Sequence, residues 1–117
     1  PEAAGPLVRG FAGTLFSIDG ETYRAALMTP RSVVPWTPPA LAELTQETLA
    51  PLLALQPAPE FILLGTGPAT IHPPRALVRA LEAHGIGLEA MDSRAAARTW
   101  AVLRAEERWI AAALMPL

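Results

Sequence analysis

The sequence has 117 residues, a formal net charge of −2 and no cysteine. Hydrophobic residues make up 51% of it and charged residues 17%, which suits one domain with a core of its own. The lack of cysteine excludes disulfides and thiol chemistry, and arginines spread without a cluster argue against a nucleic-acid-binding protein.

The low content of charged residues has two explanations that composition leaves open. Either a second subunit covers part of the surface, or the many alanines raise the apolar count. No apolar stretch approaches the roughly 18 residues of a membrane-spanning helix, and no basic segment followed by an apolar one opens the chain. We therefore expect a cytoplasmic protein with no membrane insertion. Frequent Arg, Ala and Pro, with no Lys or Asn, indicate a GC-rich bacterial genome.

The N-terminal part of the chain reads as a β-hairpin. Residues 1–10 mix Pro, Gly and Ala, so we expect them to be flexible. Residues 14–18 have strand character, and Asp19-Gly20 is a turn signal because both residues tolerate positive φ. Residues 21–28 then alternate as a second strand would.

A third extended segment, residues 31–36, follows the hairpin. Pro35 cannot donate a ladder hydrogen bond, so this segment is expected at a sheet edge. Together with the hairpin it forms a predicted β portion over residues 11–36.

From residue 45 onward helices and strands alternate. Thr45 is a predicted helix N-cap, with Leu44 and Leu49 placed as a hydrophobic staple. The predicted elements are a helix over 46–55, a strand over 61–64, a helix over 73–84, a strand over 86–90, a helix over 94–104 and a strand over 108–115. This order predicts a β-α-β-α-β unit with parallel central strands in an α/β portion over residues 45–117. We expect residues 1–117 to form a single domain.

Gly65-Thr66-Gly67 is the first candidate site, because it follows an unbroken apolar strand and precedes a helix. Loops at the carboxyl ends of strands often hold ligands in α/β sheets, and free backbone N–H groups there can bind an anion. Pro68, Pro73 and Pro74 remove donors, and no dinucleotide or phosphate-loop motif is present. The alternative, which we favour, is that the glycines allow close packing and that Gly65 takes a turn conformation that Val would resist.

Three more residues join this candidate rim. His72 is a possible general base or ligand, but for both His72 and His84 we favour an ordinary surface or capping histidine. Asp92-Ser93 follows the next parallel strand and emerges on the same side, where it could grip a polar ligand, although we favour helix capping as its role. The candidate binding rim is therefore Gly65, Thr66, Gly67, His72, Asp92 and Ser93. The sequence shows no metal-ligand spacing, cofactor motif or complete catalytic set.

Several segments together resemble a small family of unknown function. They are Phe61-Ile62-Leu63-Leu64-Gly65-Thr66-Gly67, Gly85-Ile86-Gly87-Leu88-Glu89-Ala90-Met91-Asp92-Ser93, Ala96-Ala97, Thr99, Ala111-Ala112-Ala113-Leu114-Met115-Pro116, Pro35-Trp36 and Leu44-Thr45. The family includes the mitochondrial respiratory complex I assembly factor 3 and an adipogenesis-associated animal protein. This chain departs from its pattern in two places. It has Trp100-Ala101 where the family often has Tyr-Asn, and Glu107 where the family often has Gly.

The resemblance implies a three-layer α/β fold, with a central mixed, largely parallel sheet, flanking helices and a small N-terminal β portion. It also implies that this chain, as a bacterial member, acts through protein contact, as in respiratory complex assembly. We therefore expect it to bind protein partners, to form homo-oligomers, or both. Ala101 weakens any enzyme interpretation, so we lean against an enzyme. The alternative is a small-molecule or anion-binding protein, or an enzyme, that uses the Gly65-Thr66-Gly67 rim.

Overall fold

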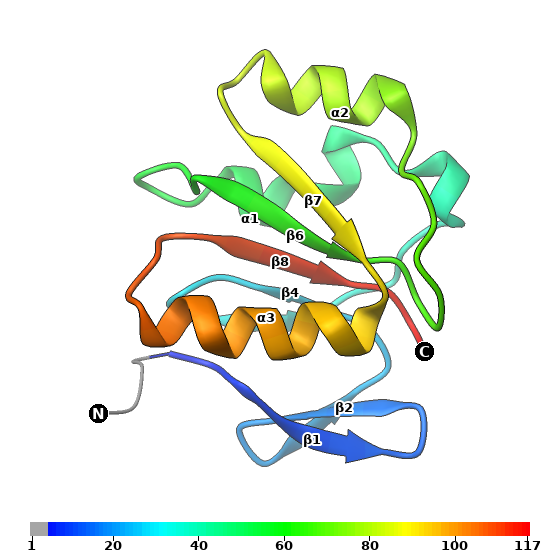
Figure 1. Cartoon of the computed structure of the whole chain (residues 1–117), viewed down its shortest axis with the longest axis vertical. Helices are drawn as coiled ribbons and strands as arrows, with labels where there is room; N and C mark the ends of the chain where they lie inside the picture. Colours follow the sequence, from blue (N-terminus) through cyan, green and yellow to red (C-terminus); the bar gives the residue numbers. More distant parts are fainter. Residues whose placement is uncertain (1–4) are drawn as a thin grey trace.

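Two β-sheets and three α-helices make up the computed structural model, which describes residues 5–117. The smaller sheet is antiparallel, in the order β1 (Val8–Ala12), β2 (Leu15–Ile18) and β3 (Glu21–Tyr23). The larger sheet has five strands, in the spatial order β5 (Val33–Pro35), β4 (Ala26–Met28), β8 (Ala111–Leu114), β6 (Phe61–Gly65) and β7 (Gly87–Met91) (Figure 1).

The helices are α1 (Ala50–Leu53), α2 (Arg75–Glu82) and α3 (Ser93–Ala105), and two 3₁₀ turns, Leu41–Glu43 and Gln46–Leu49, precede α1. The single helix predicted over residues 46–55 is thus a 3₁₀ turn followed by one α-helical turn. Its predicted start is confirmed, because Thr45 is the N-cap and forms a capping box with Thr48.

The larger sheet is mixed, which confirms the predicted α/β class. β6 pairs in parallel with both β7 and β8, so the predicted β-α-β-α-β unit is present. β4 pairs antiparallel with both β8 and β5, so the parallel part of the sheet is confined to β6, β7 and β8. β8 is an alanine-rich strand at the centre of the sheet, and all four of its residues are buried.

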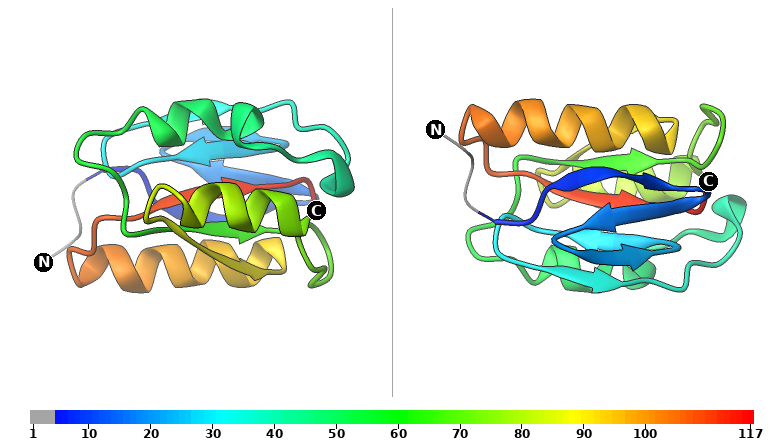
Figure 2. Two further views of the ribbon diagram at one scale, coloured as in Figure 1. Left: turned by 90° about the horizontal axis from the view of Figure 1, so that it is seen from above. Right: turned by 90° about the horizontal axis from the view of Figure 1, so that it is seen from below.

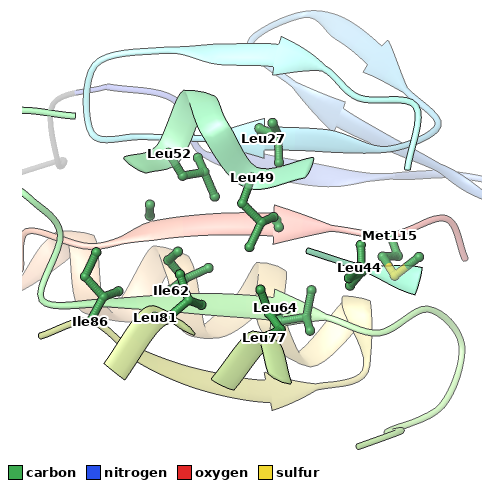
Figure 3. Close-up of a cluster of buried hydrophobic side chains, with 12 residues drawn as sticks. Leu27, Leu44, Leu49, Leu52, Ile62, Leu64, Leu77, Leu81, Ile86 and Met115 are labelled. Atoms are coloured by element: carbon green, nitrogen blue, oxygen red, sulfur yellow. The ribbon is translucent and has the colours of Figure 1, made fainter. Parts of the chain in front are cut away.

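Each face of the larger sheet has its own apolar cluster. On one face, leucines from α1, α2 and the 3₁₀ turns converge on Ile62 and Leu64 of β6 (Figure 3). On the other face, Trp100 of α3 and Phe16 of the smaller sheet pack with Leu63 of β6. α3 therefore lies on the opposite side of β6 and β8 from α1 (Figure 2).

The N-terminal predictions need two corrections. Residues 8–10 lie in β1, within the segment predicted to be flexible, while residues 1–4 lie outside the described residues. The indole of Trp100 donates to the carbonyl of Pro6 at 2.8 Å, a contact that local sequence cannot reveal. Residues 21–28 are also two strands, because the chain leaves the smaller sheet after Tyr23 and joins the larger one at Ala26.

Other local predictions in this region are confirmed. The turn at Asp19-Gly20 has φ values of 50° and 84°, and it joins the antiparallel pair β2 and β3. β5 lies at the edge of its sheet, as Pro35 indicated. It belongs with β4 to the larger sheet, however, and not to the hairpin with which the sequence grouped it.

Two helices end in the same backbone motif. After α2, the N–H of Gly85 donates to Glu82 and the N–H of Ile86 donates to Leu81, with Gly85 at a φ of 75°. This is a Schellman motif, and it confirms the predicted glycine C-cap. After α3, Glu107 occupies the equivalent left-handed position at a φ of 60°.

Candidate functional site

The structure brings five of the six candidate rim residues together at the carboxyl end of β6. Gly65 ends the strand, Thr66 and Gly67 follow it, and α3 begins at Ser93 with Asp92 as its N-cap. The N–H of Ser93 donates to the carbonyl of Gly67 at 2.8 Å, and the N–H of Thr66 donates to that of Met91 at 2.8 Å. The predicted neighbourhood of the two strand ends is therefore correct.

Ser93 is the centre of this corner and is fully buried. Its Oγ accepts a hydrogen bond from the N–H of Gly67 and donates one to the carbonyl of Met115, both at 2.8 Å. The N–H of Met115 in turn donates to the carbonyl of Gly65 at 3.0 Å. One hydroxyl thus joins the ends of β6 and β8 to the start of α3, and the N–H groups of Thr66, Gly67 and Ser93 are already bonded within the protein.

The two glycines serve different purposes. Gly67 has a φ of 103°, a conformation that L side chains rarely adopt. Gly65 has no such angle, so the predicted turn conformation is wrong for it. It is needed because a Cβ there would lie 2.7 Å from Ser93 Oγ, 2.9 Å from Ser93 Cα and 3.1 Å from Leu114 Cδ2. Close approach, and not backbone angle, selects glycine at the end of β6.

Thr66 organises the loop of residues 66–74 that follows. Its hydroxyl donates to the carbonyl of Ala69 at 2.6 Å and lies 3.2 Å from that of Met91. The same oxygen accepts a hydrogen bond from the N–H of Ile71 at 3.2 Å. Because Thr66 is buried, these contacts fix the loop from within.

Asp92 and His72 differ in their surroundings. Oδ1 of Asp92 accepts from the N–H of Ala95 at 2.9 Å, which is the N-cap interaction that the sequence predicted. His72 is exposed, and within residues 5–117 no hydrogen bond links it to the corner. The structure therefore groups Asp92 with the helix start and leaves His72 on the loop.

The buried hydroxyls of the corner, on Thr66 and Ser93, are bonded to nearby backbone groups, while the half-buried Asp92 caps α3. No group of three or more His, Asp and Glu residues comes together as metal ligands would within the described chain. The arrangement does what a packing corner does: it fixes the central strand against α3 and sets the path of the following loop.

The opposite end of β6 carries exposed chemistry that sequence reasoning missed. Glu60 and Arg108 form an ion pair at 3.0 Å, just before β6 and β8 begin. The hydrogen bond from Arg108 lowers the pKa of Glu60 below its ordinary value, and Glu60 raises that of Arg108. The guanidinium of Arg31 stacks 5.1 Å from the ring of Trp109. No motif marks these residues, which come from three separate segments.

A hollow of about 280 Å³ lies near the amino ends of β6 and β7. It is lined by Leu53, Ala58, His84 and Ile86. The segment that contains Ala58 is anchored where the indole of Trp109 donates to the carbonyl of Pro57 at 2.6 Å. The sequence had read His84 only as a helix-terminal histidine, and nothing local linked it to Leu53.

The chain is similar in sequence and fold to several known proteins. A family model described as "Protein of unknown function (DUF498/DUF598)" matches residues 8–115. A crystal structure of a Bordetella parapertussis protein superposes with a TM-score of 0.88 at 34% identity, covering 100% of both chains. An uncharacterised Rhodobacter capsulatus protein is 34% identical over all of this chain and 90% of its own length.

A zebrafish relative carries a functional name. It is the NADH dehydrogenase [ubiquinone] 1 alpha subcomplex assembly factor 3 of Danio rerio, 29% identical over 97% of this chain. This chain spans 66% of that protein's length and 55% of the bovine protein of the same name. None of the helices within residues 5–117 has the length and apolar character that a membrane-spanning helix needs.

Proposed function

The chain belongs to the DUF498/DUF598 family, and on that premise we propose that it acts through protein contact, as an assembly-type factor for a respiratory NADH dehydrogenase. One observation carries the proposal: the zebrafish assembly factor matches 97% of this chain. The assembly factor therefore contains a counterpart of nearly the whole fold, with additional sequence of its own. We extend the assembly role of the full-length zebrafish protein to this chain as part of the proposal.

The chemistry of the corner agrees with this proposal. Gly65, Gly67 and Ser93 use their polar groups to hold the fold together. A small ligand or anion on the Gly65-Thr66-Gly67 rim, the alternative function, would need free donors at that place. No specific contact in the corner favours that alternative over the packing role.

The test uses affinity-tagged protein expressed from its own locus in its native host. We expect subunits of the respiratory NADH dehydrogenase to be enriched at least fivefold over an untagged control, measured by quantitative mass spectrometry, roughly a 1 kcal/mol preference. A deletion strain should contain less of the fully assembled enzyme on native gels. No enrichment, together with normal enzyme levels in the deletion strain, would reject the proposal. Sedimentation of the purified protein tests self-association separately.

A further inference from the structure

The outer face of α3 carries exposed charges that are sorted by sign along the helix. Figure 2 shows α3 on the outside of the molecule, and no other element of residues 5–117 covers the side of the helix that faces away from the sheet. The exposed residues of this face are Arg94, Arg98, Val102, Ala105 and Glu106. The face is thus basic in its first half, apolar beyond the middle and acidic where the helix ends.

This order of charges opposes the dipole of the helix. The N-terminal end of a helix favours acidic side chains and the C-terminal end favours basic ones. Asp92 and Arg104 follow that rule, but Asp92 caps the helix and Arg104 is buried and bonded to a backbone carbonyl. The exposed charges do the reverse, with Arg94 and Arg98 in the first half and Glu106 at the C-cap. Complementary charges outside the chain would stabilise this arrangement.

We propose that α3 is the interface of a homodimer in which the helices of two copies pack antiparallel. Antiparallel packing places the basic half of each helix against the acidic end of the other, so that the two faces are electrostatically complementary. A two-fold axis at the height of residue 100, midway between Arg98 and Val102, satisfies both ends at once, because an isologous interface contains every contact twice. The dimer goes beyond the proposed assembly role and does not depend on it.

Arg98 is the arginine that pairs with Glu106 of the second copy. In this register the two residues are offset by four positions, about 6 Å along the helix axis. Helical side chains lean toward the N-terminus of their own helix, which is the direction in which Glu106 of the second copy lies. Within residues 5–117 neither residue forms an ion pair. Arg94 is less available, because its guanidinium lies 4.7 Å from the ring of Phe11.

The middle of the face allows two helices to approach closely. Val102, which is 58% exposed, would cover the aliphatic stem of Arg98 in the other copy, and Ala95, Ala101 and Ala105 flank it. Small side chains at a contact bring helix axes together. The helix has 13 residues, so the contact is smaller than the roughly 800 Å² per partner of a standard interface. We therefore expect a weak dimer, with a dissociation constant on the order of 100 μM.

The experiment exchanges the two charges and measures association by sedimentation velocity. The variants are Arg98→Glu and Glu106→Arg, studied alone and as an equimolar mixture from roughly 10 μM to 1 mM, a range that brackets the expected constant. Glu82→Arg is the matched control, because Glu82 is the exposed last residue of α2 and receives the same change of charge at the end of another helix. Circular dichroism checks that each variant is folded.

We expect the wild-type protein to dimerise and each single variant to dimerise at least about tenfold more weakly, because like charges then oppose each other at both ends. The mixture should recover to within about threefold of the wild type, since a mixed dimer contains two Glu–Arg contacts. Glu82→Arg should dimerise as the wild type does and should not rescue Arg98→Glu. In the wild type, raising NaCl from about 0.05 to 0.5 M should weaken the dimer by screening the ion pairs.

A wild-type protein that stays monomeric over the whole range would overturn the dimer. Single variants that dimerise normally, or a mixture of folded variants that fails to recover, would overturn α3 as the interface. A wild-type dimer that salt does not weaken would overturn the ionic register without any substitution. None of these results bears on the recovery of NADH dehydrogenase subunits, so a failure of the dimer and a failure of the assembly role are distinguishable.

Discussion

The two ends of β6 are built by opposite means. At the carboxyl end, Gly65 packs against Ser93 so closely that no side chain fits, and the hydroxyls of Thr66 and Ser93 are buried. At the amino end, Glu60 and Arg108 pair in the open, each with more than 40% of its side chain exposed. The carboxyl end, where the Gly65-Thr66-Gly67 pattern suggested a ligand site, is thus the end whose polar groups stabilise the fold. Surface chemistry at the other end arises from segments that no motif connects.

The strongest test of this comparison is the same substitution at both ends of the β6–β7 ladder. Gly65→Val would place side-chain atoms within 3 Å of Ser93 and disturb its hydrogen bonds. We expect a loss of about 3–5 kcal/mol in the free energy of unfolding, from overpacking and broken buried hydrogen bonds. Urea denaturation followed by circular dichroism measures it.

Gly87→Val is the matched control, because Gly87 begins β7 opposite Phe61. A Cβ there would meet only Phe61 Cβ at 3.4 Å, an ordinary contact, and φ is not positive. We expect a change within about 1 kcal/mol, since valine suits a strand. Equal losses at the two positions would show that close packing at Gly65 is not what distinguishes the carboxyl end.

Removal of the hydroxyl at the centre of the corner should have the next largest effect. Ser93→Ala leaves the N–H of Gly67 and the carbonyl of Met115 without their partner. Each unsatisfied buried group costs roughly 1–3 kcal/mol, so we expect the two together to cost at least about 2 kcal/mol. Asp92→Ala, one residue earlier, should cost only about 1 kcal/mol through the lost cap. A smaller effect for Ser93→Ala than for Asp92→Ala would contradict the central role of this hydroxyl.

The features that the sequence could predict are those that depend on residues close together in the chain or on the order of its helices and strands. The N-cap at Thr45, the N-cap at Asp92 and the C-cap at Gly85 depend on a few neighbouring residues, so they were predictable. The parallel pairing of β6, β7 and β8 followed from the alternation of helices and strands. These are local signals with known physical causes.

The features that were missed depend on contacts across the chain. β1 is positioned with the help of Trp100, whose indole bonds to Pro6 from 94 residues away. The requirement for glycine at Gly65 comes from Ser93 and Leu114, which sequence reading cannot place beside it. At the candidate site, the sequence identified the right neighbours but could not show that their donors and acceptors satisfy one another.

A third prediction concerns the turn that leads toward the amino end of β8. Glu107 has a φ of 60°, which disfavours a residue with a Cβ. Glu107→Gly should therefore stabilise the protein, by about 0.5–1 kcal/mol after the greater freedom of glycine in the unfolded chain is subtracted. Glu106→Gly is the control, because its φ of −86° needs no glycine and the change should destabilise. Thermal unfolding of both variants would decide the matter, and stabilisation by neither would contradict the strain argument.

The smallest expected effect lies at the exposed end itself. The pKa of Glu60 is lowered by Arg108, so the native state favours the ionised carboxylate. The stabilisation is fully present above the unfolded pKa of about 4.3 and is lost as the pH falls through the lower native value. Glu60→Gln should flatten this part of the pH–stability curve, measured by urea denaturation between pH 2.5 and 7, roughly the range of carboxylate titration. Glu89→Gln removes an equal charge without this ion pair and should leave that part steeper. Because solvent screens the exposed pair, a large loss of stability at neutral pH in Glu60→Gln would show that the amino end, too, holds the fold together.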